Sequence, residues 1–288
     1  MIMDAGHVRE SVRVQRDKPA APVTDFYAAL HHHGLNLVLQ TAQAALLNAG
    51  IQASNQSVAI SPVVLDVSDF DQVQSFATSI ARPVDVLMNN AGLMGPDFKL
   101  SKQGIEIQMA TNHLGHFVLT AGLWGKLNEA KSARVVSLSS VVHRRGNFDA
   151  SNIEVLRGAD QNKYNRWQRY ADSKLACLWF ARELHNRITA EGGQIKSVAA
   201  HPGWAITGLQ ENFPHVLDPL AQTAKQGARS QVYAALGSDI QGGDFVGPSL
   251  ELWGKPKKIA GSKRSHDQAQ MRALWSSSEA LTGVKFLS

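Results

Sequence analysis

Three short apolar segments, each followed at once by polar or turn-forming residues, constrain the fold of this chain most. Helical patterns separate them, and the segment that begins at Arg134 is a short β-branched run, as buried parallel strands are. Right-handed crossovers bring the carboxyl ends of such strands to one edge of a sheet. The sequence therefore predicts an α/β fold, a single doubly wound parallel sheet with helices on both faces. The segments are Val84–Met88 before Asn89-Asn90-Ala91-Gly92, Arg134–Leu138 before Ser139-Ser140, and Ile195–Ala200 before His201-Pro202-Gly203.

A tyrosine and a lysine, Tyr170 and Lys174, lie four positions apart in a helical pattern from Trp167 to about Arg187. Side chains at this spacing share one helix face. A free phenol has a pKa of about 10, and a nearby lysine cation lowers that pKa by favouring the phenolate. The pair is a candidate proton donor and acceptor for a carbonyl/alcohol couple near neutral pH. The spacing alone is weak, because many surface helices carry Tyr-x-x-x-Lys by chance.

Five motifs in order narrow the interpretation: Asn89-Asn90-Ala91-Gly92, Thr111–Phe117, Ser137–Ser140, Tyr170–Lys174 and His201-Pro202-Gly203. With them the chain, from about Leu35 to Val284, resembles the short-chain dehydrogenase/reductase family. Gly104–Phe117 and Tyr170–Ala176 resemble its retinol-dehydrogenase-like and protochlorophyllide-reductase-like branch. The resemblance implies a Rossmann-type fold and a nicotinamide-dependent oxidoreductase acting on a carbonyl or alcohol.

The resemblance also implies roles for single residues. Tyr170 would exchange the proton, Lys174 would lower its pKa and anchor the ribose, and Ser140 would hold the substrate oxygen, with Ser139 as the other candidate. The Asn112 backbone would bind a water linked to Lys174. Asn89 would stiffen the sheet, and His113 and His116 would be structural. Cofactor contacts are expected from Asp66, Val67, Asn90, Ala91, Gly92, Pro202, Gly203 and Thr207. An N-cap role explains Asp66 nearly as well.

The chain departs from the family where a glycine-rich turn should receive the cofactor's pyrophosphate. Arg16–Val23 stands there, and no glycine occurs between Gly6 and Gly34. Two explanations are open. Arg16 and Lys18 could bind phosphate as point charges, or the phosphate-binding turn is lost, either by mutation or because this segment comes from an altered reading frame or a wrong start. The second explanation is favoured, because two prolines remove backbone amides that such a loop would supply.

The N-terminal part is otherwise expected to be irregular. Met1–Glu10 should be frayed, Ser11–Gln15 should form the first strand, and Asp25–His33 should be the remnant of the first helix, so that 11–34 is an atypical first βα unit of a single domain, 1–288. The three histidines that end this helix point in different directions, so a solvated helix end is favoured over a metal site. Further expected elements are strands at Leu35–Gln40 and Ser57–Val67, helices at Thr41–Ala49, Asp69–Ala81, Ile105–Ala130, Ala221–Leu236 and Ser265–Leu281, and a substrate-facing loop at Phe148–Tyr164.

The cofactor and substrate are only partly readable. An acid after the second strand would bind a ribose hydroxyl and an arginine a 2′-phosphate, but Gln40-Thr41-Ala42 offers neither. The branch resemblance favours NADP, with NAD as the alternative. The family's substrate lid falls at Trp204–Leu220, and its apolar residues favour a lipophilic small molecule, although apolar lids also pack as core edges.

Composition limits the partners. The net charge of +5 is mild, and the basic residues Lys255–Lys258, Lys263 and Arg264 fit a solvated surface better than a nucleic-acid site. The single cysteine, Cys177, excludes an internal disulfide and is expected to be a packing residue. No membrane span or signal peptide is evident, so a cytoplasmic location is expected. The family's pairing through two long helices implies a dimer or tetramer. A cofactor-defective pseudo-enzyme or binding protein is the second hypothesis, motivated by the missing glycines.

Overall fold

The computed structural model describes residues 2–3, 25–30, 59–205 and 222–287, and for 2–3, 25–30, 59–62 and 224–225 only the backbone. Several expected features therefore lie outside the described residues. They are the strands at Ser11–Gln15 and Leu35–Gln40, the helix at Thr41–Ala49, the loop Arg16–Val23, the three histidines His31–His33, Thr207 and most of the lid.

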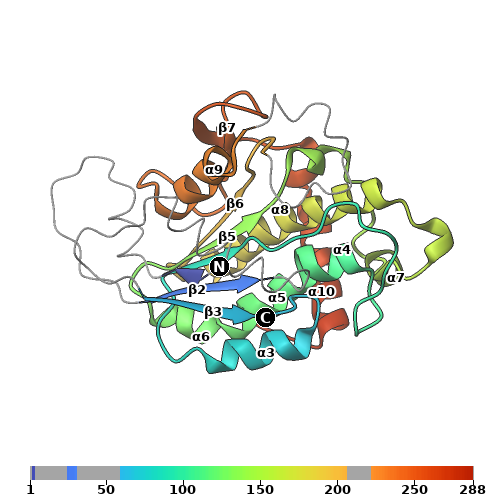
Figure 1. The fold of residues 1–288 in the computed structure, drawn as a ribbon, viewed down its shortest axis with the longest axis horizontal. Helices are drawn as coiled ribbons and strands as arrows, with labels where there is room; N and C mark the ends of the chain where they lie inside the picture. Colours follow the sequence, from blue (N-terminus) through green and yellow to red (C-terminus); the bar gives the residue numbers. More distant parts are fainter. Residues whose placement is uncertain (1, 4–24, 31–58, 206–221, 288) are drawn as a thin grey trace.

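The described residues form one eight-stranded sheet, in which two runs of parallel strands meet (Figure 1). The strand order is β3-β2-β1-β4-β5-β6-β7-β8. Strands β4 to β7 are parallel, as are β2 and β3, whereas β1 and β8 pair antiparallel with their neighbours. The doubly wound parallel sheet is thus confirmed, with antiparallel additions. The strands are β1 (Ile2–Met3), β2 (Asp25–Leu30), β3 (Ala59–Val64), β4 (Val86–Asn89), β5 (Arg134–Leu138), β6 (Lys196–Ala200), β7 (Phe245–Pro248) and β8 (Pro256–Ile259).

Helices cover both faces because successive strand side chains point to opposite sides. Leu87 and Val135 belong to the large core on the side of α3, α5 and α8, while Val86 and Val136 pack on the side of α9. Figure 1 shows α9 on one side of the sheet and α3 on the other. The α-helices are α3 (Phe70–Ser79), α4 (Ile107–Met109), α5 (Gly115–Gly122), α6 (Trp124–Glu129), α7 (Ile153–Arg157), α8 (Arg166–Ala190), α9 (Ala224–Leu236) and α10 (Gln268–Thr282).

The helix expected over Ile105–Ala130 is interrupted. A π-helical turn at Ala110–Leu114 joins α4 to α5, and the chain breaks again at Leu123 before α6. A single π turn inside an α-helix is rare and is frequent at functional sites. The turn contains Asn112, one of the predicted site residues.

Two expectations for the N-terminal part were wrong. Asp25–Leu30 is a strand, not a helix, and pairs in parallel with β3 in the register Asp25↔Ala59 to Leu30↔Val64. Ile2–Met3, expected to be frayed, forms a short strand between β2 and β4. In both cases pairing with a distant strand overrides the local pattern, as is common for strands.

The segment Phe148–Tyr164, expected to be a substrate-facing loop, contains α7 and a short 3₁₀ turn at Gln161–Lys163. Its Ala150 amide donates to Gln270 of α10, and its carbonyl accepts from Ser277. The middle of this segment therefore packs against α10.

The basic C-terminal stretch includes the edge strand β8, which the sequence analysis did not predict. Lys257 and Lys258 are exposed on it, as expected for a solvated surface. Lysines on an edge strand discourage pairing with another chain.

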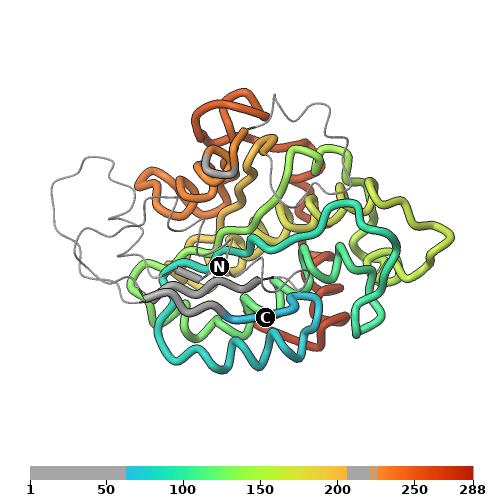
Figure 2. Tube along the Cα trace, viewed as in Figure 1, coloured from blue at the N-terminus to red at the C-terminus, as the bar shows by residue number. Residues whose placement is uncertain are grey.

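The C-terminal helix α10, in the red part of the tube in Figure 2, packs against α8 and adds its apolar residues to the large core. Trp275 packs edge-on against Phe117 of α5, with ring centroids 5.1 Å apart, and stacks on Phe180 of α8 at 6.0 Å. None of the helices in the described part of the chain is long and apolar enough to cross a membrane.

Substitution of Gly115 tests how closely α5 must approach the end of β3. A Cβ at Gly115 would lie 1.9 Å from the carbonyl oxygen of Val67, although the backbone there is ordinary right-handed helix. We expect Gly115→Ala to destabilise the protein by about 1–3 kcal/mol or more, because overpacking forces the backbone apart. Urea unfolding measures this.

Gly125→Ala in α6 is the matched control, since no atom lies within 4 Å of its added Cβ. It should leave stability unchanged or raise it by up to about 1 kcal/mol through helix propensity. Equal effects of the two substitutions would contradict the close approach at Gly115.

Candidate active site

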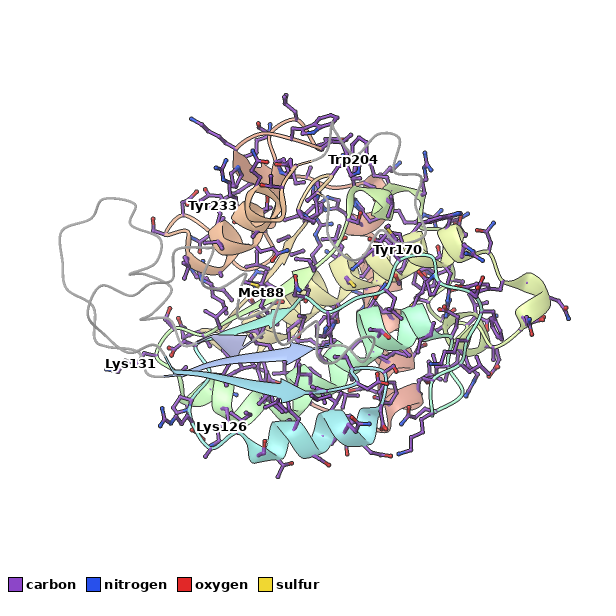
Figure 3. The ribbon with its side chains drawn as sticks, in the orientation of Figure 1. Met88, Lys126, Lys131, Tyr170, Trp204 and Tyr233 are labelled. Carbon is purple, nitrogen blue, oxygen red and sulfur yellow. The ribbon has the colours of Figure 1, made fainter. Side chains whose placement is uncertain are left out.

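The structure brings Ser140 and Tyr170 together at the carboxyl edge of the sheet. Ser140 follows β5 and caps a 3₁₀ turn, Val141–Arg145. Tyr170 lies in the second turn of α8, which Asn165 caps by accepting from the Trp167 and Gln168 amides. The two hydroxyl groups share a side-chain hydrogen bond. Figure 3 labels Tyr170 on α8.

The pKa of Tyr170 does not have the direction expected from the sequence. Burial raises it well above the ordinary value, and the hydrogen bond with Ser140 offsets only part of this rise. Lys174 Nζ lies 5.7 Å from the centre of the phenol ring, over its face. The chain's own residues therefore keep Tyr170 protonated at neutral pH, so the side chain is poised as a proton donor.

Lys174 is buried, and burial lowers its pKa. Its ammonium group donates to the Leu138 carbonyl at 3.1 Å. Within the described residues its ammonium group is bonded to this one carbonyl and no carboxylate acts on it, so two of its three N–H donors remain available to another group. A lysine held this way is suited to bind hydroxyl oxygens.

Asn112 joins the π turn to the loop after β4. Its side-chain amide exchanges two hydrogen bonds with the Leu93 backbone, at 2.7 and 3.0 Å, and donates to Ser173 Oγ at 2.8 Å. Gly92 lies against this group, since an added Cβ would be 3.0 Å from Asn112 Oδ1 and 3.4 Å from Lys174 Nζ. One wall of the candidate site is thus formed by the Asn90–Gly92 loop, Asn112 and Lys174.

The two serines after β5 differ in their surroundings. Ser139 Oγ donates to the Lys174 carbonyl at 2.7 Å and is buried, so its hydroxyl is used within the protein. Ser140 Oγ faces Tyr170 and accepts only a long bond, 3.4 Å, from the Val142 amide. The geometry favours Ser140 over Ser139 as the residue that meets a substrate.

Pro202 and Gly203 follow β6, directly beside this pair, because the Ser139 amide donates to the Ala200 carbonyl. Gln222 binds the Pro202 carbonyl at 3.1 Å, and Gly203 adopts φ +77°, where a Cβ would meet the Leu252 carbonyl at 2.4 Å. Glycine suits this left-handed conformation. The Pro202–Gly203 turn is thus tightly enclosed.

Asp66 and Val67 follow β3. Asp66 accepts from the Ser68 amide and hydroxyl at 2.9 and 2.7 Å, and the helix cap of α3 is Asp69 instead. The N-cap explanation of Asp66 was therefore wrong. Val67 is buried against Gly115.

The two histidines of the π region are buried and hydrogen-bonded within the protein. His113 Nε2 lies 2.8 Å from Ser278 Oγ, and His116 Nδ1 lies 3.1 Å from the Asn112 carbonyl. Burial lowers the pKa of each to about 3, so both are neutral. Cys177 is buried as expected, and its thiol also donates to the Asn112 carbonyl.

Asn89, at the end of β4, donates to Thr120 of α5 at 3.1 Å and so joins the sheet to that helix. The described residues contain no group of three or more His, Cys, Asp or Glu placed to hold a metal ion.

A buried ion pair beside the site was missed by the sequence analysis. Arg169, directly before Tyr170, donates from Nε to Glu106 at 2.8 Å, and its guanidinium also binds the carbonyls of Val155 and Leu156. Glu106 caps α4 by accepting from the Gln108 and Met109 amides. The pair fixes the start of α8 against α4 and α7.

Comparison with known proteins agrees with this arrangement. The family model described as short chain dehydrogenase matches residues 25–152. Retinol dehydrogenase 12 of Bos taurus is 30% identical over 247 residues, which cover 82% of this chain and 74% of that protein. The chain belongs to the short-chain dehydrogenase/reductase family. Within this family of oxidoreductases it lies in the retinol-dehydrogenase-like branch.

Solved structures show the same fold. An uncharacterized protein from Mycobacterium Paratuberculosis is 33% identical with a TM-score of 0.70, over 91% of this chain and 94% of that one. A short chain dehydrogenase from Escherichia coli CFT073, solved in complex with NADPH, has a TM-score of 0.56 at 18% identity, over 77% and 84% of the two chains. This second likeness is one of fold.

Removing Arg169 should unfold this region, because the Glu106 carboxylate would stay buried without its partner. We expect Arg169→Met to cost about 3–5 kcal/mol in unfolding free energy. The double variant Glu106→Gln/Arg169→Met should recover part of that loss, since the glutamine oxygen can still cap α4. Chemical denaturation of the purified variants gives these values.

Lys126→Met is the surface comparison, because the Lys126–Glu129 pair is solvent-exposed on α6. Its cost should be below about 1 kcal/mol. If Arg169→Met costs no more than Lys126→Met, the Glu106 pair does not hold α8.

Proposed function

We propose that this protein is a nicotinamide-dependent oxidoreductase that interconverts a carbonyl compound and its alcohol. The observation that carries the proposal is the buried Tyr170, hydrogen-bonded to Ser140 and overlain by Lys174. Family membership supports a nicotinamide cofactor, which when bound supplies or accepts the hydride.

In the reductive direction Tyr170 donates the proton that the carbonyl oxygen needs. Burial keeps the phenol protonated, so the donor form predominates at neutral pH. Ser140 Oγ donates to the same oxygen and holds it as negative charge develops. Lys174 lies against the ring and stabilises the phenolate that remains after proton transfer.

The wall formed by Gly92, Asn112 and Lys174 fits the ribose next to the nicotinamide. The missing side chain at Gly92 leaves space that a Cβ would fill, and Lys174 keeps N–H donors for ribose hydroxyls. We assign further cofactor contacts to Asp66, Val67, Asn90, Ala91, Pro202 and Gly203, and keep Thr207, outside the described residues, as a prediction. NADP is the preferred form and NAD the alternative.

The substrate we propose is a lipophilic alcohol or aldehyde. Relatives are named retinol dehydrogenases. Aromatic side chains flank the site, since Trp167 lies one turn before Tyr170 against Gly95, and Trp204 lies 6.1 Å from Trp253 between ring centroids. Retinaldehyde is therefore a reasonable first probe. A single domain over 1–288, a cytoplasmic location and a dimer or tetramer remain predictions.

Titration with NADPH and NADH, followed by nicotinamide fluorescence, tests the proposal against the cofactor-defective alternative. We expect saturable binding at micromolar NADPH and turnover of retinaldehyde, because the residues that would hold the nicotinamide end are assembled. Absence of binding at millimolar NADPH and NADH would refute the enzyme assignment and leave the binding-protein alternative, which the glycine-free Arg16–Val23 segment motivates.

Tyr170→Phe should lower turnover by about a thousandfold or more, because among the described residues no other side chain with an acidic proton is hydrogen-bonded to the Ser140 hydroxyl. NADPH binding and the thermal unfolding midpoint should change little. Steady-state reduction of retinaldehyde at saturating NADPH measures the effect.

Tyr233→Phe serves as the control, since Tyr233 lies on α9 and donates to Asp239 at the surface (Figure 3). It should keep wild-type turnover. Full activity of the Tyr170 variant would reject the assignment of this residue.

A further inference from the structure

Both ring nitrogens of His143 form hydrogen bonds within the protein, and the reaction proposed above gives this residue no role. Its Nδ1 lies 2.7 Å from the Ser140 carbonyl oxygen, and its Nε2 lies 3.0 Å from the Ser262 amide nitrogen. An amide can only donate, so Nε2 must accept. The ring is therefore neutral, and Nδ1 carries the proton that it donates to Ser140.

The surroundings of His143 keep the ring in this form and position. Its side chain is buried, and it packs edge-on against Phe245 of β7, with ring centroids 5.3 Å apart at 88°. Burial lowers the pKa of His143 and outweighs the hydrogen bond to the Ser140 carbonyl, which acts to raise it.

The segment that carries Ser262 is itself fastened to α8. Arg182 donates to the carbonyls of Ala260 and Ser265, and Trp179 Nε1 donates to the Arg264 carbonyl at 2.9 Å. A continuous set of contacts thus leads from α8 through the 260–265 segment and His143 to Ser140. The same helix carries Tyr170 near its N-terminus.

We propose that His143 is a positioning residue, which sets the Ser140 hydroxyl against Tyr170 by binding the Ser140 carbonyl and anchoring it to the 260–265 segment. The inference rests on the proposed function, because it assigns Ser140 a role in that reaction. The Ser262 amide fixes the tautomer. The Ser140 carbonyl accepts from the His143 backbone amide at 3.1 Å and from Nδ1–H at 2.7 Å, and the second, shorter bond is the one that depends on the side chain. Tyr170 is part of α8, and Ser140 is connected to α8 through His143 and the 260–265 segment. The two hydroxyl groups therefore keep their relative positions.

Two substitutions separate the two sides of the ring. Asparagine places an amide N–H near the position of Nδ1, so His143→Asn keeps the donor to Ser140 and loses the acceptor for Ser262. Glutamine places its oxygen near Nε2, so His143→Gln keeps the acceptor and loses the donor. Both remove the ring and its packing on Phe245, so a merely structural role predicts similar losses for both.

Kinetics with NADPH and retinaldehyde should distinguish the variants. We expect His143→Asn to keep kcat within about threefold of wild type, and His143→Gln to lower kcat by about 10- to 100-fold, as small misplacements of a catalytic group do. The KM for NADPH should not change in either. Equal loss of kcat in both variants would overturn the proposal.

A second measurement does not depend on turnover. Crystal structures of the two variants without cofactor should show the Ser140–Tyr170 hydrogen bond kept in His143→Asn and broken in His143→Gln. Inactive wild-type protein would refute the proposed reaction alone, and the crystal structures would still decide the positioning role. An intact Ser140–Tyr170 bond in His143→Gln would refute it.

Discussion

Burial of helix α8 on almost every side is the constraint on which the site depends. Every residue from Arg169 to Leu184 is buried, whereas an ordinary surface helix buries one stripe. The helix contacts β5 and β6 on one side and α10 on another. Tyr170 and Lys174 consequently occupy fixed positions in a medium that disfavours charge. The chemistry proposed for them needs such a medium, because a proton donor there stays protonated until a reaction demands the proton.

This burial has an energetic cost that the neighbouring polar groups offset. Arg169 and Arg182 enter the interior on the same helix as Lys174, and each is met by acceptors: a carboxylate and two carbonyls for Arg169, carbonyl groups and a hydroxyl for Arg182. Buried charges persist only where such partners are complete. The arginines therefore join α8 to distant segments. Among the residues that the structure describes, Lys174 donates to one carbonyl and so keeps N–H donors beside the phenol.

The sequence was sufficient for the strands that end in the site and insufficient for the N-terminal part. Arg134–Leu138 and Lys196–Ala200 are short, mainly apolar segments, each followed at once by polar or turn-forming residues, and this local pattern agrees with the strands observed. The apolar residues of Asp25–Leu30 do not distinguish a helix from a strand. The pairing of this segment with Ala59–Val64 is a non-local interaction, which the local sequence pattern does not encode. Ser140, the Tyr170 helix and the Pro202 turn were expected at one edge of the sheet, and the structure places them there. Their roles in the reaction remain predictions.

The sequence did not predict the long-range hydrogen-bonded pairs that hold the site together. Glu106 and Arg169 are 63 positions apart, and His143 and Ser262 are 119 apart. Nothing in a single sequence links residues at such distances. The sequence also could not predict that the pKa of Tyr170 is raised. The expectation rested on the nearby lysine, which lowers the pKa, whereas the burial of the ring, which raises it, is known only from the structure.

The π turn at Ala110–Leu114 amounts to one residue more than an α-helix would use. One residue rotates everything beyond it by about 100° around the helix axis. The stretch before the turn presents Glu106 and Gln108 to Arg169 and the Gly95 loop, and the stretch after it presents Phe117 to the aromatic core. Without the extra residue these two sets could not both face their partners. The segments before and after the π turn therefore present their side chains in different directions. Deleting one residue there would leave either the contacts of Glu106 and Gln108 or those of Phe117 intact, but not both.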